Sequence, residues 1–177
     1  MSVPNVITLG RVILVPVVFW LLLNGLNQWA FFAFVVAGVS DAVDGFLAKR
    51  FHWETELGAY LDPLADKLLI VSIFVALGFR SELPSWLVIA VVTRDILIIA
   101  GVVLAWVLDK PMVIRPIGVS KANTAAQIVL AAIVLADMSM SLGLDTLRTL
   151  LVWVTGALTV ASLAAYLDQW LRHMSET

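Results

Sequence analysis

Residues 41–67 read DAVDGFLAKRFHWETELGAYLDPLADK, and this stretch places Asp41, Asp44, Asp62 and Asp66 inside a strongly apolar chain. An ionised carboxylate in a transmembrane segment costs about 2.5–3.5 kcal/mol on insertion scales. Four carboxylates in one short stretch therefore need a compensating interaction, and a bound cation supplies it. The stretch predicts a cation site within a membrane-embedded fold.

The composition around this stretch is that of an integral membrane protein. Of the 177 residues, 62% are hydrophobic and 14% charged, and the mean hydropathy is +1.01. A run of about 20 apolar residues spans a bilayer as an α-helix. Six such runs are expected, at about 4–23, 28–48, 58–79, 84–108, 122–142 and 146–170. The predicted fold is all-α: one domain over residues 1–177, formed by a bundle of six transmembrane helices.

Basic residues gather in the breaks on one side of the predicted bundle: Lys49, Arg50, Lys110, Arg115, Lys121 and Arg172. By the positive-inside rule these loops and both termini face the cytoplasm. The first apolar run lacks an A-x-A cleavage site and another membrane-length run follows it, so we expect a first span and not a signal peptide. We predict a bacterial inner (cytoplasmic) membrane, with the four carboxylates near its cytoplasmic surface.

Several classes of site are made improbable by the composition. The chain has no cysteine, which excludes disulfides and thiolate ligands, and its two histidines, His52 and His173, lie too far apart in sequence to favour zinc. It has no basic run of the kind that binds nucleic acid, so no nucleic-acid partner is expected. Matched broken helices of the inverted-repeat kind are also missing, which weakens a transporter interpretation without excluding it.

Spacing indicates how the aspartates act together. Asp41 and Asp44 are three residues apart, and Asp62 and Asp66 four apart, so on helices each pair projects from one face. Oxygen-only ligation suits a hard divalent cation, and two such ions stabilise attacking and leaving oxygens at phosphorus. Two alternatives need no catalytic metal site: a structural ion-pair network with the nearby Lys49, Arg50 and Lys67, or a cation pathway.

The pattern Asp41-x2-Asp44-Gly45-x2-Ala48-Lys49-x8-Gly58-x3-Asp62-x3-Asp66 resembles the signature of the CDP-alcohol phosphotransferases. One residue type differs, because the family usually has arginine where this chain has Lys49 followed by Arg50. A planar guanidinium and a compact ammonium are not interchangeable at a phosphate. Whether Lys49 or Arg50 takes the place of that arginine stays open.

The resemblance implies a reaction in which an alcohol hydroxyl attacks the β-phosphorus of a CDP-linked lipid and CMP leaves. It implies two Mg²⁺ or Mn²⁺ ions held by Asp41, Asp44, Asp62 and Asp66, with Asp66 also the catalytic base. It further implies a homodimer and a site for CDP-diacylglycerol. The residues that the resemblance assigns to that lipid site are Asn5, Thr8, Arg11, Asp41, Gly45, Ala48, Lys49 and Gly58.

Motifs outside the signature narrow the resemblance. Pro4-Asn5-x2-Thr8-x2-Arg11 is similar to the branch that makes phosphatidylglycerol phosphate or cardiolipin. Thr93-Arg94-Asp95 and Ser120-Lys121-x-Asn123-Thr124-Ala125-x-Gln127 are more similar to CMP-forming cardiolipin synthases, which implies phosphatidylglycerol as acceptor; glycerol-3-phosphate is the alternative. Both acceptors carry a phosphate, so the predicted acceptor-binding residues are cations: Arg94, Arg115 and Lys121.

Simpler roles stand beside these predictions. Arg94 can neutralise its neighbour Asp95, whereas Arg115 and Lys121 can be interfacial anchors that contact anionic membrane lipids. At the level of the whole chain, a cation transporter and a non-enzymatic assembly factor compete with a lipid-synthesising transferase. Carboxylates of a transporter belong near the bilayer midplane, but here Lys49 and Arg50 follow Asp44 closely. This favours the phosphatidyltransferase.

Overall fold

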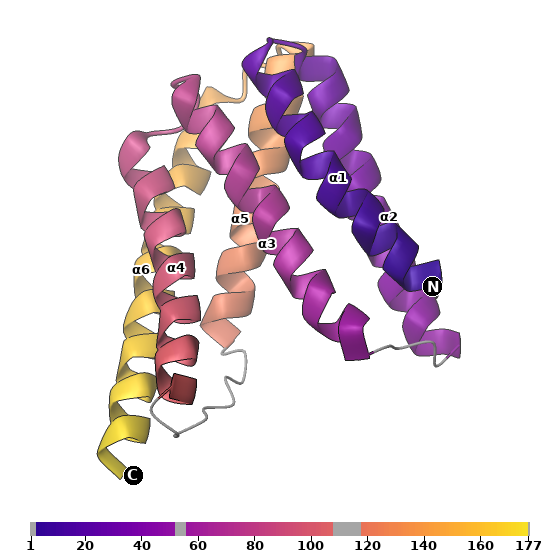
Figure 1. Cartoon of the computed structure of the whole chain (residues 1–177). Helices are drawn as coiled ribbons and strands as arrows, with labels where there is room; N and C mark the ends of the chain where they lie inside the picture. The colour runs from indigo at the N-terminus through magenta and orange to yellow at the C-terminus, as the bar shows by residue number, and fades with distance from the viewer. Residues whose placement is uncertain (1–2, 52–55, 108–117, 177) are drawn as a thin grey trace. The chain divides into compact units, whose positions relative to one another are not determined.

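The computed structural model contains six α-helices and no strand in the described part of the chain: α1 (Val3–Leu23), α2 (Asn27–Phe51), α3 (Glu56–Phe79), α4 (Ser85–Val107), α5 (Gly118–Met140) and α6 (Asp145–Glu176) (Figure 1). It describes the backbone of residues 3–51, 56–107 and 118–176, and the side chains of residues 10, 12–40, 67–101, 104, 107 and 118–172. A long apolar segment forms a helix because a helix satisfies its own backbone hydrogen bonds. The predicted all-α class is confirmed.

The apolar runs predicted the positions of the helices closely, but they predicted the polar ends of the helices less accurately. The first four helices begin and end within a few residues of the predicted runs, but α5 begins at Gly118 and α6 continues to Glu176. Hydropathy falls where a helix leaves apolar surroundings, although the helical backbone continues. At the end of α6, Arg172 Nε lies 3.0 Å from Asp168 Oδ2 on the exposed face, an i, i+4 pair that suits a solvated helix end.

Two helices end in the same hydrogen-bonded turn. After α1, the N–H of Leu26 donates to the carbonyl of Leu21 at 3.0 Å, and Gly25 adopts a positive φ of 75°. After α3, the N–H of Glu82 donates to Leu77 at 2.9 Å, and Ser81 has a φ of 58°. Glycine fits this left-handed position without strain, whereas serine is an uncommon occupant. Both turns satisfy terminal carbonyls that would otherwise lack a partner.

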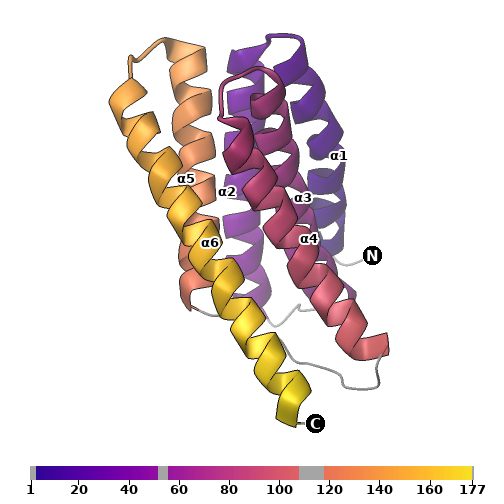
Figure 2. The same cartoon turned by 90° about the vertical axis from the view of Figure 1, so that its left-hand side faces the viewer.

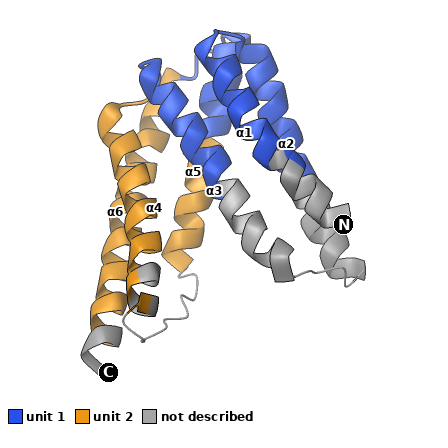
Figure 3. Ribbon diagram, viewed as in Figure 1, with its two compact units in different colours: residues 1–82, 131–144 blue, residues 83–130, 145–177 orange. Residues whose placement is uncertain are grey.

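Contacts divide the chain into two compact units, shown in different colours in Figure 3. Unit 1 comprises residues 1–82 and 131–144, and unit 2 comprises residues 83–130 and 145–177. In unit 1, α1 packs against both α2 and α3. Val18, Ile73 and Phe74 are fully buried there. The prediction of one domain over the whole chain is not tested by this division.

Unit 2 contains α4, α6 and the first part of α5, residues 118–130. Helix α4 packs against α6, and Figure 2 shows α5 and α6 running in opposite directions. Trp86 of α4 and Trp153 of α6 have ring centroids 5.4 Å apart, within the range of favourable aromatic pairs. A Cβ added at Gly156 would meet the Trp86 ring at 2.7 Å, so glycine allows this close approach.

Two of the helices are long and apolar enough to cross a membrane within the described residues: α5 and residues 145–172 of α6. Shorter apolar helical segments lie at 12–23, 27–40 and 67–79. The finer prediction of six membrane spans is therefore not confirmed. Large apolar side chains are exposed on several helices, among them Trp29, Phe32, Phe79 and Trp153, each more than 60% exposed. Such a surface suits contact with lipid better than with water.

Candidate functional site

The four aspartates fall on two helices, as their spacing predicts. Asp41 and Asp44 lie in α2, and Asp62 and Asp66 lie in α3, so each pair is separated by about one helical turn. Their side chains lie outside the described residues. Among the described residues no group of three or more acidic, histidine or cysteine side chains is placed to hold a metal. The metal site itself therefore stays a prediction.

The residues predicted to bind the CDP-linked lipid lie on these two helices and on α1. Asn5, Thr8 and Arg11 are in α1, at spacings of three residues that place neighbours on one face. Gly45, Ala48 and Lys49 are in α2, and Gly58 is in α3. The side chains of these seven residues also lie outside the part of the chain that the structure describes. Because α1 packs against both α2 and α3, one helix contacts both aspartate-bearing helices.

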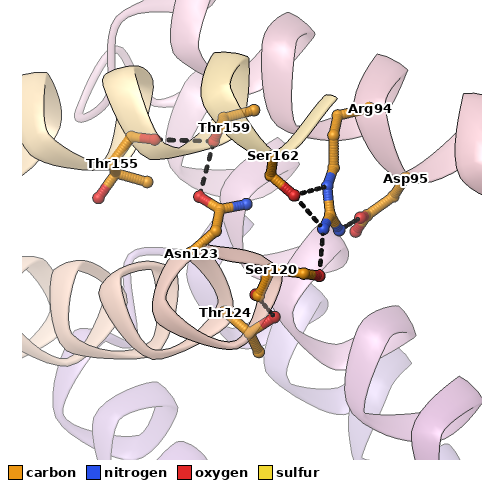
Figure 4. A network of polar contacts seen from close by, with 8 residues as sticks. All are labelled: Arg94, Asp95, Ser120, Asn123, Thr124, Thr155, Thr159 and Ser162. Atoms are coloured by element: carbon orange, nitrogen blue, oxygen red, sulfur yellow. Dashed lines mark hydrogen bonds and ion pairs between the residues drawn. The ribbon is translucent and has the colours of Figure 1, made fainter. Parts of the chain in front are cut away.

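A buried polar cluster centred on Arg94 is the best described candidate site (Figure 4). Arg94 lies in the middle of α4 and is 1% exposed. Its Nη1 donates to Asp95 Oδ1 at 2.5 Å. Its Nη2 donates to Ser120 Oγ of α5 at 2.5 Å and to Ser162 Oγ of α6 at 2.7 Å. One guanidinium thus joins three helices.

Further contacts explain why a cation is tolerated in this apolar unit. Nε of Arg94 makes a longer bond of 3.3 Å to Ser162 Oγ, and the guanidinium carbon lies 5.5 Å from the centre of the Tyr166 ring. Asp95 supplies the opposite charge and is itself only 7% exposed. A buried charge is costly unless it is paired and hydrogen-bonded, and this cluster provides both. The simpler role expected for Arg94, neutralising Asp95, is therefore present.

The other predicted acceptor-binding cations have different surroundings. Lys121 is exposed in the first turn of α5 and directly follows the half-buried Ser120 in sequence. Arg115 lies outside the described residues. Asp137 accepts the backbone N–H of Leu144 through Oδ1 at 3.2 Å, which stabilises the turn between α5 and α6. That contact gives Asp137 a structural role.

Sequence reasoning missed the contribution of α6. Ser162, Thr159 and Thr155 are buried to 1% exposure or less, and Thr159 Oγ1 lies 2.9 Å from Asn123 Oδ1 of α5. The signal was in the sequence: these residues recur at intervals of four and three along an apolar helix, which places them on one face. What the sequence did not give is the partner helix that this face meets.

Comparison with known proteins gives an independent result. The model of the CDP-alcohol phosphatidyltransferase family matches residues 1–161. A chloroplastic CDP-diacylglycerol--glycerol-3-phosphate 3-phosphatidyltransferase 1 from Oryza sativa subsp. japonica is 32% identical over 94% of this chain and 56% of its own length. Human cardiolipin synthase (CMP-forming) is 31% identical over 92% of this chain and 59% of its own length. The cardiolipin synthase (CMP-forming) of Streptomyces coelicolor is 35% identical over 58% of this chain and 50% of its own length. The chain thus spans a little over half the length of the first two of these relatives and half of the third.

Proposed function

Because the chain belongs to the CDP-alcohol phosphatidyltransferase family, we propose that it transfers a phosphatidyl group from CDP-diacylglycerol to an alcohol and releases CMP. The observation that carries the proposal is the family match over residues 1–161, which contains the whole aspartate signature. In the reaction the acceptor oxygen forms a bond to the β-phosphorus, and the bond from that phosphorus to CMP breaks. The proton of the acceptor hydroxyl must leave at the same centre.

The proposed metal ligands are Asp41, Asp44, Asp62 and Asp66. Their chemistry fits two Mg²⁺ or Mn²⁺ ions, because carboxylate oxygens are the ligands that hard divalent cations prefer. Their placement fits as well, since α2 and α3 are continuous helices through these positions and each pair shares a helix face. Bound divalent ions would neutralise the charge of the diphosphate and of the departing CMP.

Within this set we assign the base to Asp66. A carboxylate beside the acceptor takes up the proton of its hydroxyl as the new phosphodiester forms. Gly45, Ala48 and Gly58 are assigned to the diphosphate and cytidine, because small residues let a ligand approach the helix backbone closely. Lys49, with Arg50 next to it, supplies positive charge to the same group. Asn5, Thr8 and Arg11 contribute from α1, which packs against both other helices.

For the acceptor we favour phosphatidylglycerol, which makes the product cardiolipin, over glycerol-3-phosphate. The relatives carry names for both activities, so the choice rests on the motifs around Arg94 and Ser120. We assign the acceptor phosphate to Arg94, Arg115 and Lys121. Since Arg94 is buried and donates to three side chains, an acceptor phosphate has to replace Ser120 or Ser162 as its hydrogen-bond acceptor.

We place the protein in a membrane with six spans and its site on the cytoplasmic side, and we expect a homodimer in a bacterial inner membrane. Two apolar helices of sufficient length and the exposed apolar side chains support membrane insertion. The basic residues near the ends of α2 and α6 support the orientation. CDP-diacylglycerol and phosphatidylglycerol are both lipids, so a membrane location brings both substrates to the enzyme.

The test is an acceptor panel. Purified protein in mixed micelles receives CDP-diacylglycerol, Mg²⁺ or Mn²⁺, and one acceptor at a time: phosphatidylglycerol, glycerol-3-phosphate, serine or inositol phosphate. CMP release only when an acceptor is present supports the transferase, and the lipid formed identifies the acceptor. No CMP release with any acceptor, while CDP-diacylglycerol binds, would overturn the proposal.

A further inference from the structure

A polar seam runs between α5 and α6 of unit 2, through three pairs of residues. Ser120 and Ser162 both accept from Arg94, and one turn further along Asn123 contacts Thr159. The two helices run in opposite directions, so a step forward on α5 matches a step back on α6 (Figure 2). Four residues beyond Asn123 is Gln127, and four residues before Thr159 is Thr155. This register predicts that Gln127 lies opposite Thr155, as the third pair of the seam.

The third pair differs from the other two in its hydrogen bonds. Gln127 is 3% exposed and Thr155 fully buried, yet neither Gln127 Nε2 nor Thr155 Oγ1 has a hydrogen-bond partner among the described residues. A buried polar atom without a partner destabilises the folded state. The register sets these two residues opposite each other, so one bound group can serve as the partner of both.

The hydroxyl of Thr155 also departs from a local rule. Thr124, Thr149 and Thr159 each donate to the carbonyl four residues before them, at 2.8 to 3.1 Å. This back-bonding is the usual way a helical threonine satisfies its hydroxyl. Thr155 does not do so, and Figure 4 shows its side-chain oxygen turned away from its own carbonyl, the one that Thr159 uses. Its hydroxyl is therefore available for a ligand between the helices.

The hydrogen bonds of the second pair also leave one polar atom on the seam without a partner. Thr159 Oγ1 is 2.9 Å from Asn123 Oδ1 and 2.8 Å from the carbonyl of Thr155, but a hydroxyl has one proton to donate. Turning the Asn123 amide by half a rotation lets its nitrogen donate to Thr159, whose proton then goes to Thr155. Either way one polar atom of the Asn123 amide stays unpaired on the seam.

We propose that a buried water molecule is bound between Gln127 and Thr155 and bridges α5 to α6. The two groups are a neutral amide and a neutral hydroxyl, so they suit water better than an ion. Water can both donate and accept, which matches an amide N–H and a hydroxyl, and buried waters typically make about three hydrogen bonds. The bridge extends the seam from the Arg94 cluster by one more turn and fixes the register that brings Ser120 to Arg94.

The direct test is a structure of the unmodified protein at a resolution that shows ordered water. The expected result is a density peak within about 3.5 Å of both Gln127 and Thr155 Oγ1. The peak should persist in Thr155→Ser, which keeps the hydroxyl, and vanish in Thr155→Val. A direct Gln127–Thr155 hydrogen bond, or two unpaired groups with no peak, would overturn the proposal.

A double-mutant cycle gives a second readout. Gln127→Leu and Thr155→Val should each lower the unfolding temperature by about 2–4 °C, because each leaves the other group and the water with fewer partners. The double variant should lose less than the sum of the two singles, since both polar partners are then gone. Thr149→Val, on the exposed part of α6, is the matched control and should change little. Additive losses would contradict a shared ligand.

Discussion

Arg80, the first residue after α3, donates through Nη1 to the carbonyl oxygen of Leu22 at 3.0 Å, near the end of α1. The same Nη1 also donates to Asn27 Oδ1 at the start of α2, and Asn27 Nδ2 donates to the carbonyl of Met138 in α5 at 3.3 Å. The positive charge complements the negative C-terminal end of the α1 dipole. Arg80 thus connects the ends of three helices of unit 1. This structural role accounts for a basic residue on the side of the bundle where the sequence predicts few basic residues.

Replacing Arg80 by methionine should destabilise the protein. Hydrogen bonds made by charged groups contribute about 1.5–3 kcal/mol, and this change removes the two that Arg80 makes. We expect the unfolding free energy in detergent to fall by about 2 kcal/mol or more. Arg172→Met is the control, because the exposed pair with Asp168 is worth about 0–1 kcal/mol. Equal losses in the two variants would contradict this role of Arg80.

Arg94→Met should cost more stability than any surface substitution. It leaves the buried carboxylate of Asp95 without this cation, and breaking a buried ion pair costs about 3–5 kcal/mol. Adding Asp95→Asn removes the charge and should restore much of the loss. Thermal unfolding of the two single variants and the double variant measures the coupling.

The double variant also tests the acceptor assignment separately from folding. If Arg94 binds the acceptor phosphate, the folded double variant should show an apparent KM for the acceptor raised by about tenfold or more, with a much smaller change for CDP-diacylglycerol. Lys121→Ala should act in the same direction without destabilisation, because Lys121 is exposed. An unchanged acceptor KM in both variants would leave Arg94 a structural cation and Lys121 an anchor.

Asp66→Asn should reduce turnover far more than substrate binding. An amide can still offer an oxygen ligand but cannot take up the acceptor's proton, and loss of a general base costs about 10²–10⁴-fold in rate. CMP release measures turnover, and equilibrium binding of CDP-diacylglycerol measures affinity. Asp137→Asn is the control, since its Oδ1 can still accept from Leu144. Equal losses of binding and turnover would assign Asp66 to metal ligation alone.

Removal of divalent metal should abolish CMP release. Four carboxylates near a diphosphate repel it unless cations neutralise them, so a chelator should inactivate the protein and added Mg²⁺ or Mn²⁺ should restore activity. Asp41→Asn and Asp62→Asn should raise the metal concentration needed for half-maximal rate. Full activity in the chelator would contradict the proposed site.

Gly156→Ala should disturb unit 2 locally. The added Cβ meets the Trp86 ring at 2.7 Å, so the ring must move and its contact with Trp153 changes. We expect a loss of about 1 kcal/mol, at the lower end for overpacking, because the outer end of a side chain can move. Gly38→Ala, with nothing within 4 Å, should instead be neutral or stabilising. Thermal unfolding compares the two, and a stabilised Gly156→Ala would contradict the close contact.

Much of the secondary structure was predictable because an apolar run of about 20 residues forms a helix of about the same length. The runs at 58–79 and 84–108 correspond closely to α3 and α4. The end of α6 was missed because residues 171–176 include polar side chains that hydropathy treats as loop. In the candidate site, the placement of Asp41, Asp44, Asp62 and Asp66 on helices was confirmed, while their role as ligands stays a prediction.

The motif from Ser120 to Gln127 shows where sequence reasoning stopped. The motif indicated a branch of the family, but it did not show which of its side chains are buried and which are exposed. In the structure Asn123 and Gln127 are buried and Ser120 is half-buried against Arg94, whereas Lys121 is exposed. Lys121 is the one charged residue of the motif, and it is exposed. The motif thus combines residues that pack between helices with Lys121, the proposed acceptor-binding cation.

The sequence by itself determined the helical class, the approximate bounds of the helices and the family, because these depend on local apolar length and on residue types at fixed spacing. The tertiary structure alone decided which helix faces meet: that Arg94 of α4 is held by Ser120 of α5 and Ser162 of α6, and that Asn123 contacts Thr159. The physical reason is that a helix satisfies its own backbone hydrogen bonds within a few residues, whereas a buried polar side chain finds its partner only when distant segments pack together.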